Sequence, residues 1–302
     1  MQASTTRKTG RLQARRTRQF FLYIAPWLVG FLLVTVFPMM YSLVLSFTDS
    51  SIGKIGNFVG LKNYIHAFTG DRLFYTAIKN MVRYAAMFVP LALLFALGIA
   101  MILNQKIRGR GLFRVCFYVP SICAGVAVTL LWGWMLSPSF GLVNYYLSFL
   151  GIQGPGWLSD MKWAMFSIVL TNLWTQGNMI VIFLAGLQDI PEHLYESARI
   201  DGANWWNRFR HVTLPMLSPT LFFNLVLTLI SALQMFNQVY ILTEGGPVDA
   251  TYVYMLHVYN NAFRYGRMGV ASTLSWLLLV FIFVVTMLVV GTSKFWVHYA
   301  EE

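Results

Sequence analysis

Uncharged polar side chains interrupt two long apolar segments at helical spacing. In residues 163–187, Thr171, Trp174, Thr175 and Asn178 follow one another at i, i+3, i+4 and i+7, which predicts one helix face. In residues 220–242, the corresponding face carries Asn224, Thr228, Ser231 and Met235, with Gln234 and Gln238 nearby. Hydroxyls, amides and an indole ring offer neutral hydrogen-bonding groups beside a flat apolar surface, which suits a hydroxylated ligand such as a sugar.

The candidate substrate-binding residues are therefore Thr171, Trp174, Thr175, Asn178, Thr228, Ser231, Gln234 and Met235. A second interpretation stays open beside this one. Ser, Thr and Asn side chains also join neighbouring membrane helices by hydrogen bonds, and the two faces could serve helix packing alone.

Other kinds of chemistry are disfavoured by residues that the apolar segments lack. They contain no Asp, Glu or His, so a proton-coupled carrier or an intramembrane hydrolase would lack its relay or base. The chain has no Gly-x-x-x-x-Gly-Lys-Ser/Thr loop for ATP phosphates, and neither the charged rings nor the carbonyl filter expected of a channel is evident. Cys116 and Cys123 would lie roughly 10 Å apart on one helix, too far for a disulfide. We expect no catalytic residue, no metal site and no cofactor on this chain.

The composition indicates an all-α membrane protein. Of the 302 residues, 57% are hydrophobic and 11% are charged, whereas soluble domains average about 25% charged residues. Residues 1–19 form a basic arm, and residues 20–302 a transmembrane domain. Six apolar segments are long enough to span a bilayer, at about 20–47, 77–103, 115–135, 163–187, 220–242 and 268–292. We expect Gly98, Gly125 and Gly177 to allow close helix packing.

The basic residues predict the orientation of these spans. Most of them lie in the arm, in residues 104–114 and in residues 190–219, so these parts and both termini should face the cytoplasm. The basic residues that give the chain its net charge of +11 cluster beside the apolar segments. This pattern indicates contact with membrane lipid and argues against nucleic acid.

Residues 190–219 are the longest charged interruption between two apolar segments. Pro191 suits a first helical position, and Asp201-Gly202 should end a short helix because Gly tolerates the left-handed conformation. A second helix, roughly 204–211, carries Trp205 and Trp206 among arginines. Two interpretations remain: a docking element for a partner protein, or an ordinary cytoplasmic loop whose aromatic residues rest on the membrane surface.

The same stretch resembles a known motif. Glu196-Ser197-Ala198, then Gly202, then Val212-x-Leu214-Pro215, is similar to the EAA loop of binding-protein-dependent ABC importer permeases. Ser197 and Val212 depart from the usual Ala and Ile but are close to them in size. Other stretches, GLKNY at 60–64, LTEGGP at 242–247 and Asn261-Ala262-Phe263, resemble the sugar-permease branch.

The resemblance implies a type I ABC importer transmembrane domain with a cytoplasmic coupling helix. It implies a heterodimer with a second permease, two ATPase subunits that hold ATP and magnesium, an extracytoplasmic sugar-binding protein, and the plasma membrane of a bacterium or archaeon. Sugar permeases also contact substrate from the fourth and fifth spans. An importer of another solute, such as glycerol phosphate, is the alternative. The residues implied to dock the ATPase are Glu192, Tyr195, Glu196, Ala198, Arg199, Asp201, Gly202, Ala203, Trp205, Trp206, Leu214 and Pro215.

Overall fold

The computed structural model describes residues 19–105 and 108–298, and within these ranges it confirms an all-α fold. Its only β-structure there consists of isolated bridges, such as Thr48 with Phe58. The chain divides into two compact units, Met1–His66 with Asn261–Trp276, and Ala67–Asn260 with Leu277–Glu302. Three helices are long and apolar enough to cross a membrane, and three bent helix pairs bring the number of candidate spans to as many as six.

The first unit contains the helix Gln19–Ser46, whose last part is a π-helical turn, Leu32–Val36, followed by α2, Phe37–Ser46. α3, Lys62–Thr69, begins in this unit, and so does α16, Met268–Ser293. The π-helical turn ends next to Pro38, where the chain must accommodate a residue that has no backbone N–H.

Hydrogen bonds fix the end of the first span. The Asn63 amide donates to the carbonyls of Ser46 and Thr48, at 3.0 and 2.8 Å. The Thr273 hydroxyl of α16 donates to the same Ser46 carbonyl at 2.9 Å. At Gly269, a Cβ atom would collide with the Thr48 carbonyl oxygen, so only glycine permits this approach. Asn63 belongs to the GLKNY segment, which therefore has a structural role here.

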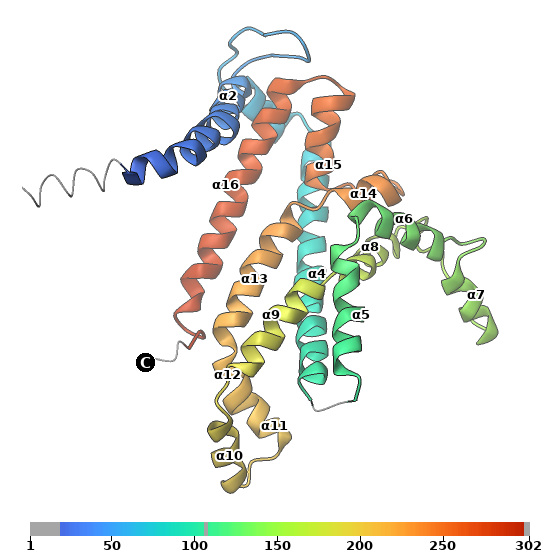
Figure 1. Cartoon of the computed structure of the whole chain (residues 1–302). Coiled ribbons are helices and arrows are strands. Elements are labelled where there is room, and N and C mark those ends of the chain that lie inside the picture. The colour runs from blue at the N-terminus through green and yellow to red at the C-terminus, as the bar shows by residue number, and fades with distance from the viewer. Residues whose placement is uncertain (1–18, 106–107, 299–302) are drawn as a thin grey trace, which may run out of the picture. The chain divides into compact units, whose positions relative to one another are not determined.

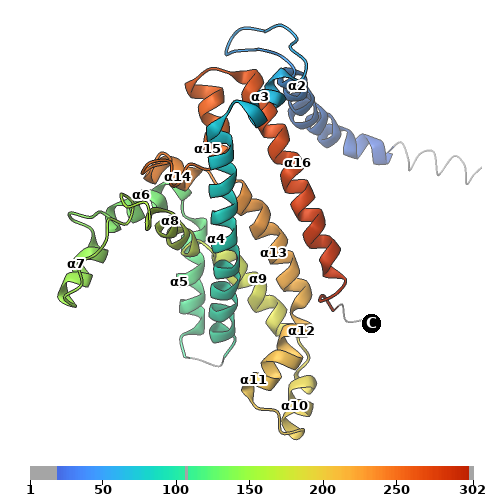
Figure 2. The same ribbon diagram turned by 180° about the vertical axis from the view of Figure 1, so that it is seen from behind.

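The second unit is a bundle around α4, Arg72–Asn104. Its 33 residues extend for about 50 Å, more than the hydrocarbon core requires. α9, Gly177–Gln188, and α13, Ser218–Leu233, pack against α4, and α5, Arg110–Ile122, packs against α9 (Figures 1 and 2).

Small residues allow the helices to pack closely. One of the three predicted glycines is among these residues, and the others are alanines. A Cβ at Gly177 would lie 2.6 Å from the Phe117 carbonyl oxygen of α5, as expected for a close helix contact. The predictions for Gly98 and Gly125 are wrong, because nothing lies within 4 Å of a Cβ at either position. The tight face of α4 is instead made by fully buried alanines four residues apart, Ala92, Ala96 and Ala100.

The predicted span 115–135 is not one continuous helix. α5 and α6, Gly125–Met135, meet at an angle of 101°. α7, Leu142–Phe149, follows α6. Hydropathy remains high through the bend, so the apolar pattern alone did not reveal it.

The predicted spans 163–187 and 220–242 are also interrupted. α8, Ala164–Leu173, is bent by 52° from α9, with Trp174–Gln176 between them. α13 ends at Leu233, and after Gln234–Phe236 a separate helix α14 covers Asn237–Leu242. Both interruptions lie in the second unit.

The 190–219 segment forms two short helices at one end of this unit (Figure 1). α10 covers Glu192–Ile200, and the turn after it has Gly202 at φ +76°, which confirms the predicted glycine-dependent helix end. The second helix starts at Trp205, one residue after the predicted start at Asn204, and continues beyond His211. It consists of α11, Trp205–Arg208, a π-helical turn, Phe209–Thr213, and α12, Leu214–Met216. Pro191 lies one residue before α10 and not within it.

At the other end, the Asn80 amide of α4 donates to the backbone carbonyls of Asp249 and Tyr252, at 2.8 and 3.0 Å. These residues follow the GGP turn and lead into α15, Tyr254–Tyr259, and a π-helical turn, Asn260–Arg264. Asn80 thereby attaches this connection to the start of α4.

Candidate functional site

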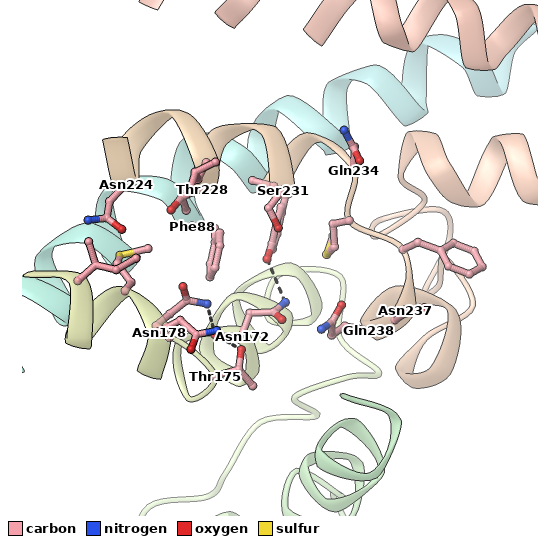
Figure 3. Close-up of a pocket in the computed structure, with 18 residues that line it drawn as sticks. Phe88, Asn172, Thr175, Asn178, Asn224, Thr228, Ser231, Gln234, Asn237 and Gln238 are labelled. Carbon is pink, nitrogen blue, oxygen red and sulfur yellow. Dashed lines mark hydrogen bonds between the residues drawn. The ribbon is translucent and has the colours of Figure 1, made fainter. Parts of the chain in front are cut away.

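A cavity of about 520 Å³ lies within the second unit, between α4, the α8–α9 break and the α13–α14 break. Its lining includes no charged side chain among the described residues. Polar groups are nevertheless dense, and Figure 3 shows Asn224 and Thr228 on α13 facing the side that carries Asn178 and Thr175. The hydroxyl and amide residues of the lining are Tyr84, Asn172, Thr175, Gln176, Asn178, Asn224, Thr228, Ser231, Gln234, Asn237 and Gln238.

The two interrupted helices supply most of this lining. In a membrane, a non-helical backbone is stable only where protein or a water-filled cavity satisfies its polar groups. Both interruptions, at Trp174–Gln176 and Gln234–Phe236, contribute residues to the same cavity. The helix breaks therefore coincide with the place where polar groups can meet a ligand.

Part of the polar lining is already occupied by internal hydrogen bonds. The Asn172 amide donates to the Tyr84 hydroxyl at 3.0 Å and to the Ile168 carbonyl at 3.2 Å. The Thr175 hydroxyl and the Gln176 amide each donate to the Asn172 carbonyl at 2.9 Å. These bonds hold the α8–α9 break in one conformation.

Four of the remaining amides are available to a ligand, whereas the Asn224 amide donates to the Thr220 carbonyl at 2.9 Å. Within residues 19–105 and 108–298, the side chains of Asn178, Gln234, Asn237 and Gln238 make no hydrogen bond. Each carries two donors and one acceptor oxygen. They can therefore hydrogen-bond a neutral ligand that presents many hydroxyls.

An aromatic group completes the wall. Phe236 lines the cavity, and its ring centroid lies 5.2 Å from that of Tyr240 and 5.0 Å from that of Tyr259. Such a group provides a flat apolar surface beside the free amides.

Six of the eight predicted substrate residues line this cavity: Thr175, Asn178, Thr228, Ser231, Gln234 and Met235. Thr171 and Trp174 are not among the residues that line it. Thr171 is buried and donates to the Ile168 carbonyl at 2.8 Å. The Trp174 ring packs edge-on against Trp132 at 5.9 Å. The helix break after Leu173 removes both residues from the face that a continuous helix would give them.

The cavity is also lined by four residues that helical spacing did not predict: Asn172, Gln176, Phe236 and Asn237. All four lie at or beside the helix breaks, where helical spacing no longer predicts which residues share a face. Their signal in the sequence was the concentration of amides on both sides of Trp174 and Met235.

The residues expected to dock a partner lie together on α10–α12. Most are exposed: Glu192, Glu196, Arg199, Asp201, Gly202, Trp205, Trp206 and Leu214, whereas Tyr195, Ala198, Ala203 and Pro215 are half-buried. The Tyr195 hydroxyl lies 3.0 Å from that of Thr213 and joins α10 to the following helix. Phe209 stacks on Trp205 at 5.8 Å. The contact between Tyr195 and Thr213 thus holds the two helices of the segment together, and Trp205 and Trp206 form an exposed aromatic surface on it.

Comparison with known proteins agrees with this architecture. Residues 89–300 match the family model of the binding-protein-dependent transport system inner membrane component. The chain is 41% identical to a probable ABC transporter permease protein, YesP, of Bacillus subtilis, over 93% of this chain and 92% of the relative. It is 34% identical to the trehalose/maltose transport system permease protein MalF of Thermococcus litoralis, over 95% and 97% of the two chains.

A solved structure shows the same fold. A crystal structure of a bacterial ABC transporter involved in the import of the acidic polysaccharide alginate superposes with a TM-score of 0.82 at 25% identity, covering 94% of this chain and 98% of that one. The chain therefore belongs to the family of binding-protein-dependent transport system inner membrane components, whose members similar to it include sugar ABC transporter permeases.

Proposed function

We propose that this chain forms, with a second permease, the path by which an ABC importer carries a sugar or oligosaccharide across the membrane. The observation that supports this most strongly is the uncharged, amide-rich cavity at the two helix breaks. Neutral donors and acceptors match hydroxyls, and Phe236 can cover the apolar face of a sugar ring. The names of relatives that transport trehalose, maltose and lactose agree with this substrate class.

The alternative substrate, an anion such as glycerol phosphate, is less well supported. A phosphate group would call for Arg, Lys or several backbone N–H groups, and the described lining contains no basic side chain. A neutral sugar requires no such partner.

The energy for transport would come from ATPase subunits that dock on residues 190–219. The α10–α12 segment, whose helices are joined by the contact between Tyr195 and Thr213, has charged side chains and two tryptophans on its surface. The exposed residues are Glu192, Glu196, Arg199, Asp201, Trp205 and Trp206. It lies at the same end of the unit as Asn104 and Gln105, which precede Arg108, Arg110 and Arg114. This common end is consistent with the proposed cytoplasmic side.

In the proposed mechanism, closure of two ATP- and magnesium-loaded ATPases moves the coupling segment and opens the path outward. An extracytoplasmic sugar-binding protein then releases substrate into the cavity, and hydrolysis resets the path. The permease performs no covalent chemistry. It belongs in the plasma membrane with both termini inside.

The amides of the cavity permit a direct test in the importer reconstituted with its ATPase and binding protein. Asn178→Ala removes an amide that has no internal partner, so sugar-stimulated ATP hydrolysis should require about tenfold more substrate while thermal stability stays unchanged. Asn172→Ala is the matched control. It leaves the buried Tyr84 hydroxyl without its donor, so stability should fall by about 1–3 kcal/mol.

A panel of neutral sugars and glycerol phosphate, tested with the same reconstituted importer, identifies the substrate class. Stimulation by at least one neutral sugar and not by glycerol phosphate is the expected result. Stimulation by glycerol phosphate alone would refute the sugar assignment. If both asparagine variants lost stability equally and kept normal sugar response, the cavity would be a packing feature.

A further inference from the structure

A second cavity of about 520 Å³ lies where the α10–α12 segment packs against the ends of α4 and α9. It is separate from the sugar cavity and shares no lining residue with it. Much of its wall is apolar and comes from the two membrane helices and the coupling segment: Gly98, Met101 and Ile102, Leu187, and Trp205 and Phe209.

The rest of the wall is polar and includes two basic side chains. Arg199 and Arg208 line the cavity, and no described carboxylate does. In the part of the chain that the structure describes, the one contact between a carboxylate and a basic side chain is that of Asp71 with His257, so neither arginine has an acidic partner. The Arg208 Nε is buried and makes no hydrogen bond there.

An unpaired, buried guanidinium N–H is unfavourable, and the usual remedy is an anionic acceptor. Phosphate oxygens suit this role because a guanidinium can donate to them in a bidentate manner. The Tyr195 and Thr213 hydroxyls, 3.0 Å apart, lie in the same wall and offer further polar contacts.

We propose that this cavity binds a phosphate-bearing anion, and that its occupant is an anionic phospholipid. The phosphate would lie against Arg208 and Arg199, and an acyl chain against Met101, Ile102 and Leu187. The cavity lies at the C-terminal end of α4, a helix long and apolar enough to cross a membrane, so the proposal places it beside the lipid headgroups. Basic pockets between helices at this level are suited to anionic headgroups.

The lipid would connect the coupling segment to α4, because Arg208 and Trp205 belong to α11 while Gly98 and Met101 belong to α4. Binding itself does not depend on the proposed transport function. Only an effect of the lipid on transport would depend on it.

The test uses the assembled importer in nanodiscs that contain either zwitterionic phosphatidylcholine or anionic phosphatidylglycerol. Retained lipid is counted by native mass spectrometry, and thermal stability is followed as phosphatidylglycerol is titrated. Arg208→Gln should weaken the response to phosphatidylglycerol by about tenfold or more. Arg210→Gln, an equal loss of charge at an exposed arginine outside the cavity, should leave that response unchanged.

Two further arms distinguish the source of the phosphate. Gly98→Leu adds a side chain where a Cβ meets nothing within 4 Å, so it should exclude the acyl chain and leave the arginines in place. Titration with inorganic phosphate shows whether the anion alone suffices. Stabilisation by inorganic phosphate that requires Arg208 but is insensitive to Gly98→Leu would assign the site to a soluble phosphate and overturn the lipid occupant.

The proposal as a whole is overturned if Arg208→Gln and the wild type respond equally to phosphatidylglycerol and to phosphate, or if neither probe has any effect. These readouts are lipid retention and stability, so they remain interpretable even if the importer proves to carry no sugar.

Discussion

A hydrogen bond between His257 and Asp71 joins two distant parts of the second unit. The His257 Nε2 lies 2.9 Å from an Asp71 carboxylate oxygen, and its Nδ1 lies 3.1 Å from the Tyr252 hydroxyl. The other Asp71 oxygen accepts from the backbone N–H groups of Leu73 and Phe74 and caps α4. One carboxylate thus serves both the helix start and α15.

This arrangement predicts a loss of stability in acid. Burial lowers the pKa of His257, against the opposing effect of Asp71, the charged group that faces it. In the unfolded chain, histidine takes up a proton below about pH 6.5, so the unfolded state binds more protons and the free energy of unfolding falls below that pH. Thermal melts of the wild type across this range should show the decrease.

His257→Gln is the control for this prediction. Glutamine can donate to Asp71 but does not titrate, so the variant should lose less stability between neutral and acidic pH. Parallel melting curves for the two proteins would show that another group controls the acid response.

The kinds of side chain that line the cavity were easier to predict from the sequence than which of them share one face. The polar groups of α13, Asn224, Thr228 and Ser231, share a face because that helix is continuous, and helical spacing therefore identified them. Thr171 and Trp174 do not line the cavity with Thr175 and Asn178, because the helix breaks immediately after Leu173. Spacing rules fail at such a break, although it is the feature that makes the cavity.

Among the elements, the contact between α5 and α9 depends on one glycine. A Cβ at Gly177 would lie 2.6 Å from the Phe117 carbonyl oxygen and 3.0 Å from the Tyr118 Cα, both backbone atoms. Gly177→Ala should therefore destabilise the protein by about 1–3 kcal/mol, since α5 must move away. A thermal melt in detergent measures this change.

Gly125→Ala provides the comparison, because a Cβ there meets nothing within 4 Å. Its melting temperature should equal or exceed that of the wild type, since alanine favours the helix. Equal destabilisation by both substitutions would show that helix propensity at a bend, and not the α5 contact, sets the requirement for glycine.

The apolar segments could be predicted from the sequence, but the bends within them could not. Hydropathy indicates that a segment belongs in a membrane, but it does not show where the helix axis changes direction within that segment. The 101° bend between α5 and α6 occurs at Cys123 and Ala124, in a segment whose mean hydropathy stays high although Pro120, Ser121 and Gly125 flank the bend.

For the whole molecule, the proposed function requires that force on the α10–α12 segment reaches the membrane helices. The turn at Gly202 sets the angle between α10 and α11, and it has φ +76°. Gly202→Val places a β-branched residue in a conformation that costs roughly 1–2 kcal/mol or more. We expect membrane insertion to survive, and sugar-stimulated ATP hydrolysis and ATPase co-purification to fall several-fold.

Gly202→Asn separates backbone strain from the simple presence of a side chain. Asparagine tolerates positive φ, and a Cβ at this position meets nothing within 4 Å, so this variant should retain most of the coupling. If the valine variant transported sugar normally, the turn would not transmit force, and the aromatic surface of α11 would need another explanation. If the asparagine variant failed as completely as the valine variant, the partner subunit would contact Gly202 itself, and coupling would depend on that contact and not on the turn angle.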